Sequence, residues 1–384
     1  MCGIAVAVNW DDAEVVVRGL VRDIIHRGDV TDPVVSVGRK TAMCTRRLRI
    51  VDAENAVQPQ LSFDGKILVS FNGELYNHVE LRRELEALGA HFQTASDTEV
   101  LATGLAIWGA SALERINGMY AFVAIDTSTG QFLAARDPLG VKPLYFIQSG
   151  AGFLFCSEIR PLLSAVKAGN VMFLPPGYAF TRMQLRAFKT FVASPSENFI
   201  EHDPQVLDRL LAAAVHRRIP PNLPFAVMFS GGIDSTLVLH YARQLQPGTP
   251  GYFLGGDEAP DYQFAASYAD QTGLDLRCVA FDEDRDMDML NRIDEIVEAT
   301  ETFEPDAIRS GLCTYLLAKR IHQDGYRVAL VGEGADELFA GYIPLELAFA
   351  DGDLIGSYVR HQHMVCDASF KSTTDRPLRY ALST

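Results

Sequence analysis

A cysteine, Cys2, directly follows the first methionine of the chain. Removal of Met1 would leave a thiol nucleophile and a free α-amine on the same residue. A free α-amine has a pKa of roughly 7.7–8, so near neutral pH it can act as the general base for its own side chain. A cysteine at this position is also typical of an ordinary buried strand, so other residues must decide between the two interpretations.

A glycine-containing loop in the second half of the chain has the composition of an anion-binding site. The residues 225–229 read as a buried strand, and Ser230-Gly-Gly-Ile-Asp-Ser-Thr236 reads as a loop followed by a helix start. Two glycines let the backbone wrap an anion, and a helix N-terminus offers unpaired N–H groups and a favourable dipole. The loop is not a Walker P-loop, because it lacks the Gly-x-x-x-x-Gly-Lys-Ser/Thr pattern. The alternative is a plain glycine turn.

A second motif, Gly332-Glu-Gly-Ala-Asp-Glu-Leu-Phe-Ala-Gly-Tyr342, follows a predicted strand over 327–331. Ligands of open α/β sheets bind at the carboxyl ends of the strands. The spacing therefore predicts that this motif and the glycine loop share one edge of a sheet.

The opening Met-Cys-Gly-Ile resembles the start of class II glutamine amidotransferases, whose N-terminal cysteine attacks the side-chain amide of glutamine. Further motifs occur in the order typical of that family. They are His26-Arg-Gly, Arg47-Leu-Arg-Ile-Val-Asp, Gln58-Pro, Phe71-Asn-Gly-Glu-Leu-Tyr-Asn, Ser96-Asp-Thr-Glu-Val, Asn117-Gly-Met-Tyr-Ala-Phe and Arg136-Asp-Pro-Leu-Gly-Val-Lys-Pro-Leu-Tyr. In place of the Pro-Asp that often follows His-Arg-Gly, this chain has Asp29-Val30.

The resemblance implies a catalytic role for three residues. Cys2 is the nucleophile, and the side-chain amide of Asn72 and the backbone N–H of Gly73 form the oxyanion hole. Attack on an amide creates an oxyanion that needs preorganised donors, and loss of one donor typically costs about 10²–10³ in rate. We expect Asn72-Gly73 to lie at a strand end, where glycine allows close approach; the alternative is a hairpin turn.

The resemblance also implies residues that bind the glutamine α-groups. Arg47 suits the α-carboxylate through its bidentate fork, and Glu74 and Asp97 suit the α-ammonium. The alternative for Arg47 and Asp97 is a solvated surface charge.

The second half resembles ATP pyrophosphatases, and the 332–342 motif resembles the asparagine synthetase signature. By this resemblance Asp234 and Asp336 hold Mg²⁺, Glu333 lies near an acyl-adenylate, and Leu254 and Val331 flank the adenine. The residues implied to bind ATP or pyrophosphate are Ser230, Gly231, Gly232, Asp234, Ser235, Thr236, Leu254, Val331 and Gly332.

These motifs predict a glutamine-dependent amide ligase that uses ATP and Mg²⁺ and transfers ammonia to a carboxylate activated as acyl-AMP. The acceptor is aspartate or a related carboxylic acid. Asparagine synthetases continue well past the 332–342 motif, with a lysine that acts on the leaving pyrophosphate, and neither feature is readable here. Two alternatives therefore stay open: a glutaminase or scaffold protein without full synthetase activity, and a partial subunit completed by a partner chain.

The elements that must position these residues differ between the two halves. Short apolar segments at 4–8, 67–71, 120–125, 131–135 and 144–147 predict mostly antiparallel strands, with helices over 78–88 and 97–108. Together with the resemblance they indicate an α+β N-terminal nucleophile (Ntn) hydrolase sandwich. After a polar stretch, helices over 205–218 and 235–244 alternate with strands over 225–229, 251–254, 276–281 and 327–331, which predicts an α/β doubly wound parallel sheet that binds an adenine nucleotide. The predicted domains are 1–193 and 205–384, joined by a linker over 194–204.

Bulk properties narrow the class of protein. The chain has 384 residues, 48% of them hydrophobic, and a net charge of −15. This balance argues against a nucleic-acid or anionic-membrane surface. Apolar runs are too short to cross a bilayer, no secretory signal is recognised, and the 6 cysteines show no metal-ligand or disulfide spacing. We therefore expect a cytoplasmic enzyme whose partners are small molecules, as a homodimer or with a partner chain.

Overall fold

A computed structural model describes residues 1–166, 170–189, 203–280, 293–301 and 305–342. The chain divides into two compact units, and the division falls between Phe191 and Val192. The predicted linker over 194–204 lies almost wholly outside the described residues. None of the described helices is long and apolar enough to cross a membrane.

The first unit contains two antiparallel sheets. The first sheet has the order β11-β9-β10-β1-β4-β2, with β3 also pairing β4. Its strands are β1 (Gly3–Val8), β2 (Val30–Thr31), β3 (Val35–Ser36), β4 (Ala42–Arg47), β9 (Tyr145–Ser149), β10 (Gly152–Cys156) and β11 (Met172–Phe173). The second sheet has the order β13-β12-β8-β7-β6-β5. Its strands are β5 (Gln60–Leu61), β6 (Ile67–Leu75), β7 (Gly118–Asp126), β8 (Phe132–Arg136), β12 (Tyr178–Thr181) and β13 (Leu185–Ala187).

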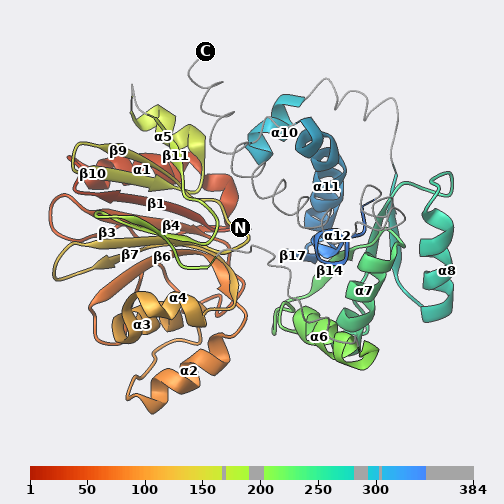
Figure 1. The fold of residues 1–384 in the computed structure, drawn as a ribbon. Helices are drawn as coiled ribbons and strands as arrows, with labels where there is room; N and C mark the ends of the chain where they lie inside the picture. Colours follow the sequence, from red (N-terminus) through yellow and green to blue (C-terminus); the bar gives the residue numbers. More distant parts are fainter. Residues whose placement is uncertain (167–169, 190–202, 281–292, 302–304, 343–384) are drawn as a thin grey trace, which may run out of the picture. The chain divides into compact units, whose positions relative to one another are not determined.

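Helices cover the outer face of each sheet, so the unit is a four-layer sandwich (Figure 1). The helices are α1 (Ala13–Asp23) and α5 (Ile159–Ala165) on the first sheet, and α2 (His78–Ala87), α3 (Asp97–Trp108) and α4 (Ala112–Arg115) on the second. Apolar side chains of both sheets, among them Ile4, Met43 and Leu68, fill the layer between them. The α+β sandwich expected from the sequence is confirmed.

Strand alternation places the candidate residues in the layer between the sheets. Successive side chains of a strand point to opposite faces. Ile4, Met43 and Leu68 belong to the inter-sheet core. Residues 2 and 47 on the first sheet and 72 and 74 on the second share their parity, so they point into the same layer.

Side-chain hydrogen bonds between neighbouring residues fix the start of helix α3. The Ser96 side chain accepts the backbone N–H of Glu99 at 3.2 Å, and the Glu99 carboxylate accepts the N–H groups of Gln93 and Thr94 at 2.9 and 2.8 Å. The first of these bonds satisfies a donor that a helix N-terminus leaves unpaired, and the other two fix the residues that lead into the helix. As a result Asp97, the first residue of α3, is held at a defined place beside the end of β6.

The second unit is built around a parallel sheet of order β16-β15-β14-β17. Its strands are β14 (Phe225–Met228), β15 (Gly251–Leu254), β16 (Leu276–Val279) and β17 (Val328–Leu330), and its helices are α6 (Pro204–His216), α7 (Ile233–Leu245), α8 (Tyr262–Thr272), α10 (Ile293–Thr300), α11 (Pro305–Gln323) and α12 (Ala335–Phe339). One face packs against α6, α7 and α8, and the other packs against α11. Helices on both faces of a parallel sheet confirm the doubly wound arrangement.

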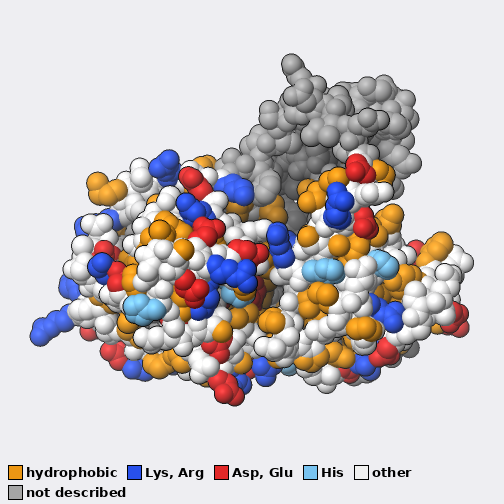
Figure 2. Space-filling view, turned by 90° about the horizontal axis from the view of Figure 1, so that it is seen from below, with side chains coloured by type: hydrophobic (Ala, Val, Ile, Leu, Met, Phe, Trp, Pro, Cys, Tyr) orange, Lys and Arg blue, Asp and Glu red, His pale blue; other side chains and the backbone are white. Residues whose placement is uncertain are grey.

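Charges of both signs are interspersed over the surface. On the face drawn in Figure 2, acidic and basic side chains lie beside one another on the described residues, with no broad patch of one sign.

Candidate functional site

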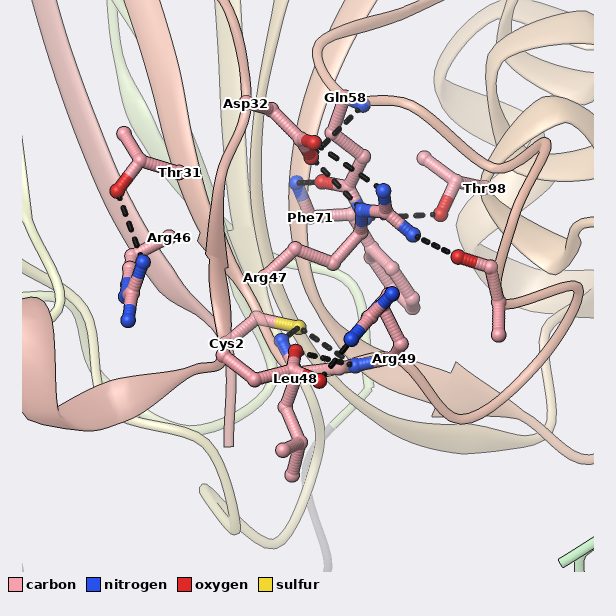
Figure 3. Close-up of polar contacts among 12 residues, drawn as sticks. Cys2, Thr31, Asp32, Arg46, Arg47, Leu48, Arg49, Gln58, Phe71 and Thr98 are labelled. Carbon is pink, nitrogen blue, oxygen red and sulfur yellow. Dashed lines mark hydrogen bonds and ion pairs between the residues drawn. The ribbon is translucent and has the colours of Figure 1, made fainter.

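Cys2 lies just before β1 and faces the residues that follow β4. The Leu48 backbone N–H points at the Cys2 Sγ at 3.4 Å, and the thiol points at the Leu48 carbonyl oxygen at 3.8 Å (Figure 3). Burial raises the pKa of the Cys2 thiol, and the carboxylates of Glu74 and Asp97 raise it further. The thiol is therefore neutral at pH 7 and needs a base to become a nucleophile.

A base of suitable pKa lies at the same place. The α-amine of Met1 is the terminal amine of the chain, and burial lowers its pKa to about 6. An amine with this pKa is largely unprotonated at pH 7 and can accept a proton. The same buried end of the sandwich would surround the α-amine of Cys2 after loss of Met1.

Asn72 and Gly73 lie inside β6 rather than at its end, which corrects our expectation. Strand β6 pairs with β7 as far as Leu75, because Gly118 and the residues after it continue the ladder. A Cβ on Gly73 would overlap the carbonyl oxygen of Met119, so only glycine allows the two strands this close. The hairpin-turn alternative is thereby excluded.

The side-chain amide of Asn72 is a buried donor with no acceptor. Asn72 is 1% exposed, and its Nδ2 has no hydrogen-bond partner among the described residues. Buried donors are nearly always paired, and an unpaired one costs about 1–3 kcal/mol. Such a cost is expected where a donor is held ready for a transient oxyanion.

The guanidinium of Arg47 is already bonded to other residues of the unit. Its Nε and Nη2 donate to the Asp32 carboxylate at 2.8 and 3.1 Å, and its Nη1 donates to the Ala53 carbonyl at 3.0 Å (Figure 3). A guanidinium has five N–H groups, so two remain. The arginine is buried, not on the surface, and a carboxylate ligand could use one N–H from each terminal nitrogen. The sequence predicted a bidentate fork for the glutamine α-carboxylate, and in the structure Asp32 takes the edge of this fork formed by Nε and Nη2.

Glu74 and Asp97 form a pair of close carboxyl groups. Burial raises the pKa of Glu74 well above its usual range, and Asp97 adds to this rise. Burial also raises the pKa of Asp97, although the Leu75 backbone N–H, which donates to its carboxylate at 2.9 Å, opposes the rise. Two adjacent carboxyls of this kind attract a cationic group such as an ammonium.

Lys142 is a charged residue of this site whose role sequence reasoning missed. It is buried, burial lowers its pKa, and Glu74 and Cys2 oppose that effect, so its ammonium lies within electrostatic reach of both. Asp137 fixes its loop by accepting the backbone N–H groups of Val141 and Lys142 at 3.0 and 3.1 Å. Its motif is visible in the sequence, but nothing in the motif shows that the lysine turns inward.

The glycine loop of the second unit joins β14 to α7 as expected. Gly231 has a φ of 80°, and a Cβ on it would lie 2.7 Å from the Ala265 backbone nitrogen. Within the loop, Ser230 and Ser235 hydroxyls lie 3.0 Å apart, and Thr236 donates to the Gly232 carbonyl. Local bonds and a close helix thus hold the loop in shape while Ser230 and Gly232 stay exposed.

The two aspartates of the predicted metal site lie near each other. Burial raises the pKa of Asp234, and the charge of Asp336 raises it further. A Cβ on Gly332 would lie 3.0 Å from Asp234 Cβ, so the 332–342 motif packs directly on the start of α7. Two facing carboxylates fit a divalent cation, since oxygen ligands are those that Mg²⁺ prefers.

The remaining predicted residues surround the same sheet edge. Leu254 ends β15 and Val331 follows β17, the two strands that flank β14. Glu333 is exposed, and Val331 is 45% exposed. These positions leave an apolar side chain on each side of the loop, as an adenine site requires.

Comparison with known proteins assigns both halves. Residues 1–176 match the family model of the glutamine amidotransferase domain, and residues 206–373 match that of asparagine synthase. A glutamine-hydrolysing asparagine synthetase of Sandersonia aurantiaca is 31% identical over 89% of this chain and 67% of its own length. The nodule enzyme of Pisum sativum is 30% identical over 89% of this chain and 60% of its own.

The chain thus spans between 60% and 67% of the length of these two relatives. Among solved structures, glutamine phosphoribosylpyrophosphate amidotransferase of B. subtilis, complexed with ADP and GMP, is 18% identical with a TM-score of 0.43, over 67% of each chain. The sequence relationship, which extends over both units, shows that the chain belongs to the glutamine-hydrolysing asparagine synthetase family.

Proposed function

We propose that this chain hydrolyses glutamine at Cys2 and uses the ammonia to amidate a carboxylic acid activated by ATP. The observation that carries the first half is the buried, unpartnered amide of Asn72 in the layer that also contains Cys2. The curated relatives are asparagine synthetases, so aspartate is the acceptor we propose.

The proposed glutaminase reaction uses groups of the first unit only. After removal of Met1, the α-amine of Cys2 takes the thiol proton, and the sulfur attacks the amide carbon of glutamine. The oxyanion accepts hydrogen bonds from Asn72 Nδ2 and the Gly73 N–H. The C–N bond then breaks, the ammonium returns its proton to the leaving ammonia, and water hydrolyses the thioester to glutamate.

Substrate orientation in this proposal comes from the charged residues around the cysteine. Glu74 and Asp97 bind the α-ammonium of glutamine, which relieves their mutual repulsion. Arg47 binds the α-carboxylate through the two N–H groups that Asp32 and Ala53 leave available. Asp32 then serves to fix the plane of the guanidinium.

In the second unit we propose that the glycine loop binds the phosphates of ATP and that the carboxylate attacks the α-phosphorus to form an acyl-adenylate and pyrophosphate. Asp234 and Asp336 would hold Mg²⁺, which when bound neutralises charge on the phosphates. Ser230, Ser235 and Thr236 donate to the pyrophosphate, Leu254 and Val331 enclose the adenine, and Glu333 lies near the acyl group. We also propose that the two functional domains correspond to 1–193 and 205–384.

The test is a coupled assay on the purified chain. Glutamate, pyrophosphate and amide product are measured with glutamine, ATP and Mg²⁺ and with aspartate or one of a panel of other carboxylic acids. We expect pyrophosphate and asparagine in equal amounts with aspartate. Glutamate without pyrophosphate from any acid would instead favour a glutaminase or a partial subunit, and native mass would then show whether a partner chain is bound.

A further inference from the structure

A buried carboxylate outside the glutamine-binding residues connects to the backbone of the nucleophile. The Glu158 carboxylate accepts a bond from Arg27 Nη1 at 3.0 Å, and Arg27 Nε donates to the carbonyl oxygen of Cys2 at 3.0 Å. His26 Nε2 lies 2.6 Å from the same Glu158 oxygen. The chain of contacts therefore runs from Glu158 through Arg27 to Cys2.

Among the described residues, the Glu158 side chain makes hydrogen bonds only with His26 and Arg27. It sits at the N-cap of α5, yet its side chain makes no cap hydrogen bond to that helix. Its side chain is 4% exposed, and that of Arg27 is 10% exposed. A buried carboxylate is destabilising unless it is paired, so the charge of Arg27 must compensate for the burial of Glu158.

The backbone beside Glu158 is attached to the same strand as Cys2. Ser157 Oγ accepts the Ile4 N–H at 2.8 Å, and the Ser157 N–H donates to the Ile4 carbonyl at 3.1 Å. The residue before Glu158 is thus bonded to Ile4, which lies two residues from Cys2 in the sequence. Glu158 therefore has little freedom to move relative to Cys2.

The ion pair is only half made. Arg27 Nη2 and Glu158 Oε2 are both buried and have no hydrogen-bond partner among the described residues. A bidentate arginine–carboxylate pair would satisfy both. Because Arg27 instead turns its Nε to the Cys2 carbonyl, the geometry favours holding the nucleophile over completing the pair.

We infer that Glu158 is a positioning residue for glutamine hydrolysis, which acts by holding Arg27 on the carbonyl of Cys2. The inference rests on the proposed function for its effect on turnover. Fixing the Cys2 carbonyl fixes the peptide unit next to the thiol, and misplacement of a reacting group by about 1 Å can cost up to about 10²-fold in rate.

The experiment is a double-mutant cycle of wild type, Glu158→Gln, Arg27→Lys and the double variant. Each is assayed for kcat and KM of glutamine hydrolysis, for melting temperature, and for the rate at which iodoacetamide alkylates Cys2. Glu158→Gln keeps the shape of the side chain and removes its charge, whereas Arg27→Lys keeps the charge and removes the fork. Glu84→Gln is the matched control, because it makes the same substitution in an exposed ion pair, that of Glu84 with Arg115 Nη1 at 3.0 Å.

We expect each single variant to lower kcat by about 10- to 100-fold with KM changed less than about threefold. The double variant should fall no further than the worse single variant, because both act through one chain of contacts. Alkylation of Cys2 should become faster in both single variants, and Glu84→Gln should stay within about twofold of wild type.

Three results would overturn the inference: a kcat of Glu158→Gln within about twofold of wild type, losses that multiply in the double variant, or a fall in kcat matched by Glu84→Gln. The same double-mutant cycle can be measured through the rate of Cys2 alkylation, which needs no glutamine. If wild type hydrolyses no glutamine, the proposed function fails, while coupled changes in alkylation would still support the positioning of Cys2 by Glu158.

Discussion

The two units build their candidate sites in opposite ways. In the first, Asn72, Asp97 and Arg47 are each no more than 5% exposed, and they come from strands and a helix of distant sequence. In the second, Ser230, Gly232 and Glu333 are exposed and lie on short loops after parallel strands. A buried site can shift pKa values strongly and hold donors ready, whereas an open sheet edge relies on loop shape and on charge.

Each of the two arrangements destabilises the unit that contains it. The first unit carries the repulsion of Glu74 and Asp97, an incompletely satisfied ion pair at Arg27 and an unpaired Asn72 amide. The second unit carries one close carboxylate pair at its solvent-facing edge. If the two sites are built independently in this way, a substitution in either site should leave the chemistry of the other intact.

The largest effect should come from Cys2→Ala. We expect loss of glutamine-driven amide formation by at least about 10³-fold, because the proposed thioester forms on the Cys2 sulfur. Activity driven by added ammonium chloride should stay near the wild-type level. Product formed from glutamine by this variant would show that Cys2 is not the nucleophile.

The matching change in the second unit is Asp234→Asn or Asp336→Asn. Each should suppress ATP-to-pyrophosphate turnover by about 10²-fold, because an amide is a poorer ligand of Mg²⁺ than a carboxylate. Glutamate release from glutamine should persist. Full pyrophosphate release by both variants would mean that the loop over 230–236 is only a turn.

A smaller effect should appear when pH is varied. Burial lowers the pKa of the Met1 α-amine to about 6, and we expect the same burial to lower the pKa of the Cys2 α-amine once Met1 is removed. We expect glutamine hydrolysis to drop about tenfold for each pH unit below this pKa, since the ammonium cannot take the thiol proton. Intact-mass measurement should show Met1 absent from active protein, and an active protein that retains Met1 would rule out this base.

The smallest effect concerns stability, through Glu74→Gln. The folded pKa of Glu74 is raised, so the carboxyl contributes stability below its unfolded pKa and loses it as pH rises through the folded value. At pH 8 the variant should therefore melt about 2–4 °C above wild type, with the difference vanishing near pH 4. Its KM for glutamine should rise at the same time, and a variant that melts lower at pH 8 would contradict the buried-charge account.

Several elements follow from local sequence alone. Helix α3 was expected over 97–108 and is found there, because Ser96 and Glu99 fix its start. Strand β15 was expected over 251–254 and is also found there. The shape of the glycine loop between β14 and α7 depends only on its own residues and one neighbouring helix. Its pattern can therefore be recognised from the sequence.

Other features depend on contacts between distant segments. Strands β4 and β10 are buried on both faces, so their sequences show no alternation. Helix α1, in contrast, buries Val17, Leu20 and Val21 at helical spacing, a pattern that the sequence does contain. Strand β6 continues through Asn72 and Gly73 because β7 supplies a partner as far as Gly118.

The residues with the types and order for glutamine and ATP chemistry are visible in the sequence, since they lie in short motifs. Three features become visible only in the folded chain: Asp32 takes the fork of Arg47, Lys142 turns inward, and Glu158 reaches Cys2 through Arg27. The pair of Glu158 and Arg27 spans 131 positions. No local pattern encodes a contact of that range, because it forms only when β10 has paired with β1 and brought Glu158 beside Arg27.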